Sequence, residues 1–347
     1  MRRLHPLRTV LAVLGIAFGL GVVACLLPER PYERWQLLDG TIHERARWIY
    51  ERVHFDPRPI DVMFVGPSRT ARGVDPLELQ DLLSRPGRPV HVVNFALPEN
   101  GRNMNDAIVE EALKTKTPKL IVIGVIEKPA RFGHPAFKYV APRSLVADPG
   151  HLANANYLSD LVYMPFRQLR LAAAYAAPQV MGLTDRFDPT KYDPDPPNPT
   201  SVVKPDGSVE DWTQPGTPQE LHRGITKLER GMHPPILPAS LADVEFGDER
   251  HYIRRIVAAA QKKGVKVAFL SIPYCTGTSD VQEQKFYNQY GPVWNAGFLS
   301  SHTELYADYA HLTIAGAKVM TAWLAPFVAQ SLSLPETPAS EVRDTRR

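Results

Sequence analysis

Short, nearly continuous apolar runs alternate along this chain with longer segments of helical periodicity. Five runs predict strands, at 60–65, 89–95, 120–126, 265–272 and 302–306. The first three are rich in Val and Ile, as is typical of strands buried on both faces of a parallel sheet. The periodic segments predict helices, at 75–84, 104–116, 157–177, 248–263, 281–298 and 314–332. The alternation predicts an α/β fold whose parallel sheet is covered by helices on both faces.

The N-terminal segment departs from this pattern. Nineteen residues without a charge, Thr9 to Leu27, follow a short arginine-rich head. That length is enough to span a bilayer, and the arginines place the N-terminus in the cytoplasm. We expect residues 1–30 to form an uncleaved, single-pass anchor in the inner membrane, with the rest of the chain in the periplasm.

Two other interpretations of this segment stay open. The stretch Val22-Val23-Ala24-Cys25 fits the lipobox of bacterial lipoproteins, in which Cys25 would be acylated. A cleaved signal peptide is the third possibility. All three would export the remainder of the chain.

Three further segments lie outside the alternation. Residues 31–59 predict one juxtamembrane amphipathic helix that either packs on the domain or rests on the lipid headgroups. Within the main domain, 60–333, an insertion covers about 128–247, and its part from 184 to 238 is rich in proline and has no periodicity. The polar tail, 334–347, is predicted to be disordered.

Composition excludes several classes of function. The net charge is +3, and 40 Lys and Arg are interspersed with 37 Asp and Glu, so nucleic-acid binding is not indicated. The chain has two cysteines and no CxxC or His-x-x-x-His spacing, so we expect neither a disulfide framework nor a metal site.

The candidate chemistry lies at two places that are far apart in sequence. Ser68 follows the first predicted strand, and Asp308 and His311 precede the last helix. Sites in parallel sheets form at the carboxyl ends of strands, so these residues could meet. A serine needs a base to take its proton, and a histidine base needs a carboxylate to orient it. Each motif alone is usually structural, but together they predict a catalytic triad.

These residues resemble the SGNH/GDSL hydrolase superfamily. The resemblance rests on Gly66-Pro67-Ser68 and on Asp308-x-x-His311-Leu312-Thr313-x-x-Gly316, and it covers roughly 60–127 and 248–331. It implies a flavodoxin-like three-layer αβα sandwich. Ser68 would be the nucleophile, His311 the general base and Asp308 its orienter, and no cofactor is implied.

The anchor, the Ser-Arg-Thr sequence at Ser68 and the Val-Asn-Phe-Ala-Leu-Pro stretch resemble exported members of the superfamily, such as alginate O-acetyltransferases and D-alanyl transfer proteins of teichoic acid. That resemblance implies an acyltransferase or esterase that moves an acyl group, acetyl above all, to or from a polysaccharide through an acyl-serine. A membrane acyl-donor protein or a polysaccharide synthase complex would be its partner.

The oxyanion hole is less well matched. The superfamily uses the N–H of the serine, a glycine N–H after the second strand and an asparagine side chain after the third. Ala96 and Gly101 are the backbone candidates here. No asparagine follows the third strand, so Asn100 or Asn103 would have to replace it, unless they bind the loop backbone instead. Pro67 also departs from the pattern, which usually has Asp, Ser or Asn. An alternative is therefore a catalytically weak scaffold or polysaccharide-binding subunit.

Two residues are candidates for binding substrate. Arg69 follows the nucleophile and could bind an anionic group, although a structural salt bridge is the other possibility. Tyr274 follows the fourth predicted strand and so belongs to the same edge of the sheet. We expect the neighbouring Cys275 to be a buried structural thiol.

Overall fold

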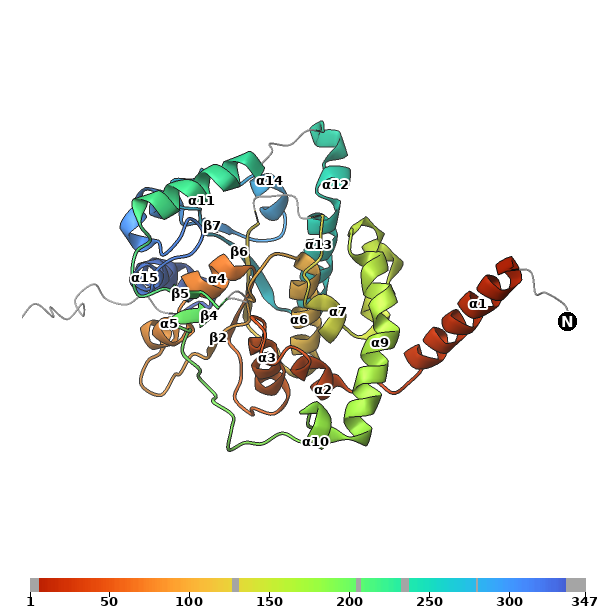
Figure 1. Cartoon of the computed structure of the whole chain (residues 1–347). Coiled ribbons are helices and arrows are strands. Elements are labelled where there is room, and N and C mark those ends of the chain that lie inside the picture. Colours follow the sequence, from red (N-terminus) through yellow and green to blue (C-terminus); the bar gives the residue numbers. More distant parts are fainter. Residues whose placement is uncertain (1–5, 127–130, 204–206, 232–236, 279, 335–347) are drawn as a thin grey trace, which may run out of the picture.

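The computed structural model describes residues 6–126, 131–203, 207–231, 237–278 and 280–334 (Figure 1). Its centre is a five-stranded parallel sheet with the order β2-β1-β3-β6-β7. The strands are β1 (Val62–Val65), β2 (Val92–Asn94), β3 (Leu120–Gly124), β6 (Lys266–Ser271) and β7 (Val293–Asn295). Counted among themselves these five have the order 2-1-3-4-5, which is common in doubly wound sheets. The predicted α/β class with a parallel sheet is confirmed.

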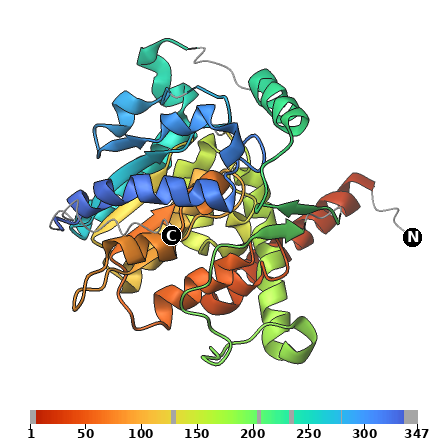
Figure 2. The ribbon, with the colours of Figure 1, turned by 90° about the vertical axis from the view of Figure 1, so that its left-hand side faces the viewer.

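Successive strand residues face opposite layers of helices, because side chains alternate along a strand. Met63 and Val65 pack in one core with α3 (Arg45–His54), α6 (Arg102–Thr115) and α13 (Gly247–Lys262). Val62 and Phe64 pack in a second core with α5 (Pro76–Leu83) and α15 (Ile314–Ser331). Figure 2 shows α15 lying across its face of the sheet. The short helix α4 (Ser68–Gly73) connects β1 to this second layer.

The last predicted strand and the helix before it are wrong. Residues 303–305 form a 3₁₀ turn, η4 (Thr303–Leu305), and the fifth strand is β7, inside the segment 281–298 that predicted a helix. The helix there is only α14 (Gln284–Tyr287), because Gly291-Pro292 follows and proline has no N–H for a helical bond. A further 3₁₀ turn, η3 (Gly297–Ser301), follows β7.

The segment after the anchor forms two helices rather than the single one predicted. They are α2 (Pro31–Gln36) and α3, separated by a turn in which Gly40 has a φ of +72°. Trp35, Ile49 and Val53 are buried in the same core as the sheet. The segment therefore packs on the domain.

Several short elements and one long helix follow β3. They are α7 (Phe137–Val140), α8 (Arg143–Val146), η1 (Pro149–Ala153), α9 (Tyr157–Ala176) and α10 (Pro178–Met181). The predicted helix at 157–177 is thus confirmed as α9. Beyond α10 the chain returns to the body as an extended segment (Figure 1).

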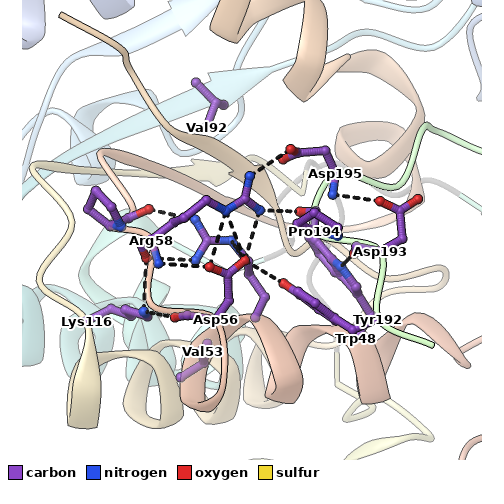
Figure 3. Close-up of polar contacts among 12 residues, drawn as sticks. Trp48, Val53, Asp56, Arg58, Val92, Lys116, Tyr192, Asp193, Pro194 and Asp195 are labelled. Atoms are coloured by element: carbon purple, nitrogen blue, oxygen red, sulfur yellow. Dashed lines mark hydrogen bonds and ion pairs between the residues drawn. The ribbon is translucent and has the colours of Figure 1, made fainter. Parts of the chain in front are cut away.

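Polar contacts fix this extended segment to the loop before β1 (Figure 3). The Tyr192 hydroxyl donates to Asp56 Oδ2 at 2.8 Å, and Arg58 Nη1 donates to Asp195 Oδ2 at 2.7 Å. Burial opposes ionisation of Asp56, but the hydrogen bonds from Arg58 outweigh it and lower the pKa of Asp56 to about 2. In the proline-rich part of the insertion, residues 192–195 are therefore held against the core.

The rest of the insertion also has regular structure that the sequence pattern does not reveal. β4 (Ser201–Val203) and β5 (Val209–Asp211) form an antiparallel pair. Helix α11 (Pro218–Gly231) follows, and η2 (Ala239–Leu241) and α12 (Ala242–Glu245) lead to α13.

The N-terminal helix α1 (Pro6–Cys25) projects away from the body (Figure 1). Its segment Arg8–Cys25 is long and apolar enough to cross a membrane, and almost all of it is exposed. This agrees with the predicted anchor in length and composition. Of the tail predicted to be disordered, 334–347, residues 335–347 lie outside the described residues.

Candidate active site

Ser68, His311 and Asp308 form a continuous hydrogen-bonded chain. Ser68 Oγ lies 2.8 Å from His311 Nε2, and His311 Nδ1 lies 2.8 Å from Asp308 Oδ2. The two segments that predicted a triad therefore come together with the geometry of a nucleophile, a base and an orienting carboxylate. All three side chains are partly exposed, so the serine is accessible from solvent.

Ser68 is placed by close packing between the ends of β1 and β3 and helix α4. A methyl group on Gly124 would lie 1.9 Å from Thr70 Oγ1, and one on Gly66 would lie 2.5 Å from the same atom. Only glycine lets the two strand ends approach the first turn of α4 so closely. Ser68 is the first residue of that helix, so its N–H has no acceptor within the helix.

A residue that the sequence did not single out fixes α4 from the neighbouring strand. The side-chain amide of Asn94, at the end of β2, donates to the carbonyls of Thr70 and Val74, each at 3.0 Å. Its Oδ1 accepts the N–H of Ala96 at 3.2 Å. The available signal was the polar residue within an otherwise apolar, fully buried strand.

The loop that carries His311 is fixed by the carboxylate of Asp308. Asp308 Oδ1 accepts the N–H groups of Ala310 at 2.7 Å and His311 at 2.8 Å, which leaves Oδ2 for the imidazole. Burial would favour the neutral acid, but the hydrogen bond from His311 and these N–H groups lower the pKa of Asp308. Thr313 caps α15 by accepting the N–H of Gly316 at 3.0 Å, so the loop ends at a fixed helix terminus.

The insertion borders this loop on both sides. The N–H of Gly216 donates to the carbonyl of Tyr306 at 2.9 Å, and the N–H of Ile314 donates to the carbonyl of Trp212 at 2.9 Å. A methyl group on Gly224 of α11 would lie 2.2 Å from the ring of Tyr309. The sequence could not reveal that the insertion forms a wall beside this loop, because the wall depends on contacts between segments about a hundred residues apart.

Of the backbone oxyanion candidates, Ser68 is the one whose N–H lies at the start of a helix and has no acceptor within it. The N–H of Ala96 already donates to Asn94 Oδ1. Gly101 has a φ of +149° and lies against the backbone of His134, where a methyl group would be 2.1 Å from the His134 nitrogen. Its backbone shape therefore requires glycine, because an L-residue rarely adopts that φ.

The two asparagine candidates lie in different environments. Asn100 is exposed. Asn103 is fully buried, and its Oδ1 accepts the N–H of His134 at 2.8 Å and of Met104 at 3.0 Å. Asn103 thus binds loop backbone, as the alternative prediction had it, and its Nδ2 is buried without a hydrogen-bond partner among the described residues. Glu127, which follows the third predicted strand where the resemblance would expect an asparagine, lies outside the described residues.

Arg69, one of the two candidates for binding substrate, makes its described contacts inside the chain. Its side chain is 5% exposed, and it donates to the carbonyls of Ile272 and Val125, just past β6 and β3. The guanidinium also lies 4.1 Å from the ring centroid of Tyr274. These contacts with carbonyl groups and a ring favour the structural interpretation of Arg69.

Tyr274 itself lies beside the triad loop. Its ring stacks on that of Tyr309 with centroids 6.2 Å apart and 11° between the planes. Cys275 is fully buried, its N–H donates to the Tyr309 carbonyl at 2.9 Å, and burial raises the pKa of its thiol. The half-buried Tyr274 remains a candidate for substrate contact, whereas Cys275 is a structural thiol.

One group of side chains in the described residues has the composition of a metal site. Ligand atoms of His43, Glu99 and His134 lie within 4.8 Å of one another. Both nitrogens of His134 are already engaged, since Nε2 lies 2.6 Å from the carbonyl of Pro98 and Nδ1 accepts the N–H of Ala136 at 3.1 Å. Neither nitrogen offers a lone pair without losing a buried hydrogen bond, so the group does not suit a metal ion.

A scan against protein-family models and a search of the curated proteins find no match to this chain. The geometry of the site therefore carries the functional argument.

Proposed function

We propose that this chain is a membrane-anchored, extracytoplasmic serine acyltransferase or esterase of the SGNH/GDSL type, with a flavodoxin-like fold. It would add acyl groups, acetyl above all, to a cell-surface or exported polysaccharide, or remove them. The observation that carries the proposal is the hydrogen-bonded chain from Ser68 Oγ through His311 to Asp308.

In the first half of the reaction Ser68 Oγ attacks the carbonyl carbon of the acyl donor. His311 Nε2 takes the hydroxyl proton as the C–O bond forms, and Asp308 stabilises the resulting imidazolium. The tetrahedral intermediate then collapses, the bond to the donor oxygen breaks, and that oxygen receives the proton from His311. The product is an acyl ester of Ser68.

In the second half a sugar hydroxyl or a water molecule attacks the acyl-serine. His311 removes the proton from the attacking oxygen and returns it to Ser68 Oγ when the ester bond breaks. Transfer results if the sugar reaches the acyl-enzyme, and hydrolysis results if water does. The wall formed by α11 and Tyr309 beside the base would govern which of them enters.

Helix α1 supports a location at the membrane. It would anchor the protein as a single span in the inner membrane and leave the catalytic domain in the periplasm. An acyl donor would reach that side through a partner, either a membrane acyl-donor protein or a polysaccharide synthase complex.

The test is covalent labelling by a fluorophosphonate probe, which reacts with an activated serine. The full-length protein should be labelled, Ser68→Ala should not, and Ser301→Ala, a substitution at an exposed serine, should be labelled at the wild-type rate. Folded wild-type protein that stays unlabelled would refute the enzymatic proposal.

The rival function is a catalytically weak scaffold or polysaccharide-binding subunit of an envelope assembly. The observation that favours it is the engagement of the oxyanion candidates, because Ala96 N–H binds Asn94 and Asn103 binds loop backbone. Loss of one oxyanion donor can cost on the order of 10²–10³ in rate. A wild-type chain that binds polysaccharide but resists the probe would establish this rival.

A further inference from the structure

Helix α9 carries a stripe of large apolar side chains that face solvent. Leu158, Val162, Phe166 and Leu169 are 71%, 67%, 64% and 53% exposed. At 100° per residue these four positions fall within an arc of about 80° on the helix surface. The stripe is therefore one continuous face rather than a set of scattered exposed residues.

The opposite face of α9 is firmly packed. Met164, Gln168 and Leu171 are buried, and Arg167 donates to the carbonyls of Lys138 and Ala141 at 2.9 Å and 2.7 Å. The helix is thus held in place by its inner side. The outward apolar face is a fixed feature of the surface.

The charged side chains of α9 lie outside the apolar stripe. Its one aspartate, Asp160, is buried, and the polar residues among its exposed positions are Ser159 and Arg170. Near its C-terminal end Tyr175 is 64% exposed and lies under the guanidinium of Arg30, 3.6 Å from the ring centroid. An apolar face with arginine beside it and without exposed acids on its helix is typical of helices that lie in the interface of a membrane.

The stripe adjoins the candidate membrane span. A methyl group on Gly21 of α1 would lie 3.7 Å from Pro165, in the middle of α9. The end of α1 is also fastened to the domain, because Arg143 Nη1 donates to the carbonyls of Cys25 and Leu27. Figure 1 shows α1 leaving the body beside α9.

The position of this contact along α1 sets the depth of α9. Gly21 precedes the end of the helix, Cys25, by four residues, which is about 6 Å along the helix axis. Interfacial helices bury their apolar face roughly 5–10 Å into the headgroup and acyl boundary. A span that ends at Cys25 would therefore hold α9 at the depth of an interfacial helix.

We propose that α9 lies in the outer leaflet of the bilayer that α1 spans, with the stripe Leu158, Val162, Phe166 and Leu169 toward the acyl chains. The proposal rests on the anchoring role proposed for α1. The protein would then contact the membrane through two helices, with α1 crossing the bilayer and α9 lying along its surface.

This arrangement also fixes the orientation of the catalytic domain. Helices α4 and α15 lie on the opposite side of the sheet from α9 (Figures 1 and 2). Ser68, the first residue of α4, is then on the side of the body away from the lipid. The site faces the aqueous compartment in which a hydrophilic polymer would be found.

The test uses the full-length chain reconstituted alone into phosphatidylcholine–phosphatidylglycerol vesicles. Single cysteines replace Val162 or Val244 in a background with Cys25→Ala and Cys275→Ala, and each carries an environment-sensitive fluorophore. Val244 of α12 is the matched control, because it is also a valine and is 71% exposed. A third cysteine replaces Ile16, near the middle of α1.

We expect the label at 162 to shift its emission to the blue and to be quenched by nitroxides near the lipid headgroups, and the label at 244 to do neither. The label at 16 should be quenched by nitroxides at the bilayer centre. Equal, water-like signals at 162 and 244 with a buried label at 16 would overturn this proposal alone and leave a protein partner as the occupant of the stripe. A label at 16 outside the bilayer would overturn the anchor as well, while fluorophosphonate labelling of Ser68 tests the enzymatic proposal separately.

Discussion

The side-chain amide of Asn94 donates a 3.0 Å hydrogen bond to the main-chain carbonyl of Thr70, two residues after Ser68. It links the end of β2 to the helix that carries Ser68, and both residues are buried. We expect Asn94→Ala to lower the free energy of unfolding by about 1–3 kcal/mol, because buried carbonyl and N–H groups lose their partner. Urea denaturation checks this value.

The same substitution should slow fluorophosphonate labelling in the protein that remains folded, since α4 loses its tie to β2. Asn100→Ala, at an exposed position of the following loop, is the control and should change neither stability nor rate. Wild-type stability in Asn94→Ala would show that α4 is fixed by its packing alone.

Asp308→Asn should leave the fold intact and nearly abolish reactivity. An amide at this position can donate to His311 Nδ1, which places the imidazole proton on Nε2. The Nε2 atom faces Ser68, and in this tautomer it cannot accept the proton of the serine. In a Ser-His-Asp triad of another fold such a change lowers the rate by on the order of 10⁴. The labelling rate of Ser68 is the measurement, and Asp188→Asn, in an exposed turn, is the control. Unchanged labelling of Asp308→Asn would remove the carboxylate from the mechanism.

Gly124→Ala should destabilise the protein through a clash with one atom. The added methyl group would meet Thr70 Oγ1 at 1.9 Å, and forced overpacking of this kind typically costs about 1–3 kcal/mol. Thr70→Ala removes that oxygen, so the double variant should recover part of the loss. A double-mutant cycle measures the coupling, and strictly additive effects would show that the glycine is needed for another reason.

Stability should decrease with rising pH because of Asp248. Burial, followed by the negative charge of Glu249, raises the pKa of Asp248 to about 7, and its Oδ2 has no hydrogen-bond partner among the described residues. The same carboxyl titrates near pH 4 in an unfolded chain. Between these values the folded state holds a proton that the unfolded state lacks, so its stabilising effect is complete below about pH 4 and is lost as the pH rises through 7.

Asp248→Asn should therefore stabilise the protein above pH 7, by a few kcal/mol at most, and the difference should vanish near pH 4. Asp243→Asn is the control of opposite sign, because hydrogen bonds from Arg254 and then Arg250 lower the pKa of this exposed carboxyl. Thermal melts of both variants between pH 4 and 8 provide the comparison, and a pH-independent effect of Asp248→Asn would contradict the titration.

The meeting of Ser68 and His311 could be predicted from sequence because it follows from topology. Ser68 follows β1 and begins α4, and His311 lies just before Thr313, the N-cap of α15. The prediction reached the right place for His311 although the strand expected at 302–306 is a 3₁₀ turn. The apolar signal there came from Tyr306, which is buried in the second core and whose hydroxyl donates to the Pro273 carbonyl at 2.9 Å.

What could not be predicted depends on contacts between distant segments. The role of Arg69 depends on carbonyl groups past β3 and β6, which no local pattern places next to it. Likewise the insertion has no periodicity of its own between 184 and 200, and it is ordered by partners such as Asp56 and Arg58. Neither kind of contact leaves a periodic signal in the chain.

The bonds that join the insertion to the triad loop have a mechanical consequence. Gly216 is tied to Tyr306 and Trp212 to Ile314, at the two ends of the loop that carries Asp308 and His311. If the insertion lifted from the sheet, both ends of that loop would lose these bonds, so under the proposed function such a movement would displace His311 from Ser68. A polymer substrate would then have to enter while the insertion stays closed, along a path that α11 and Tyr309 leave open.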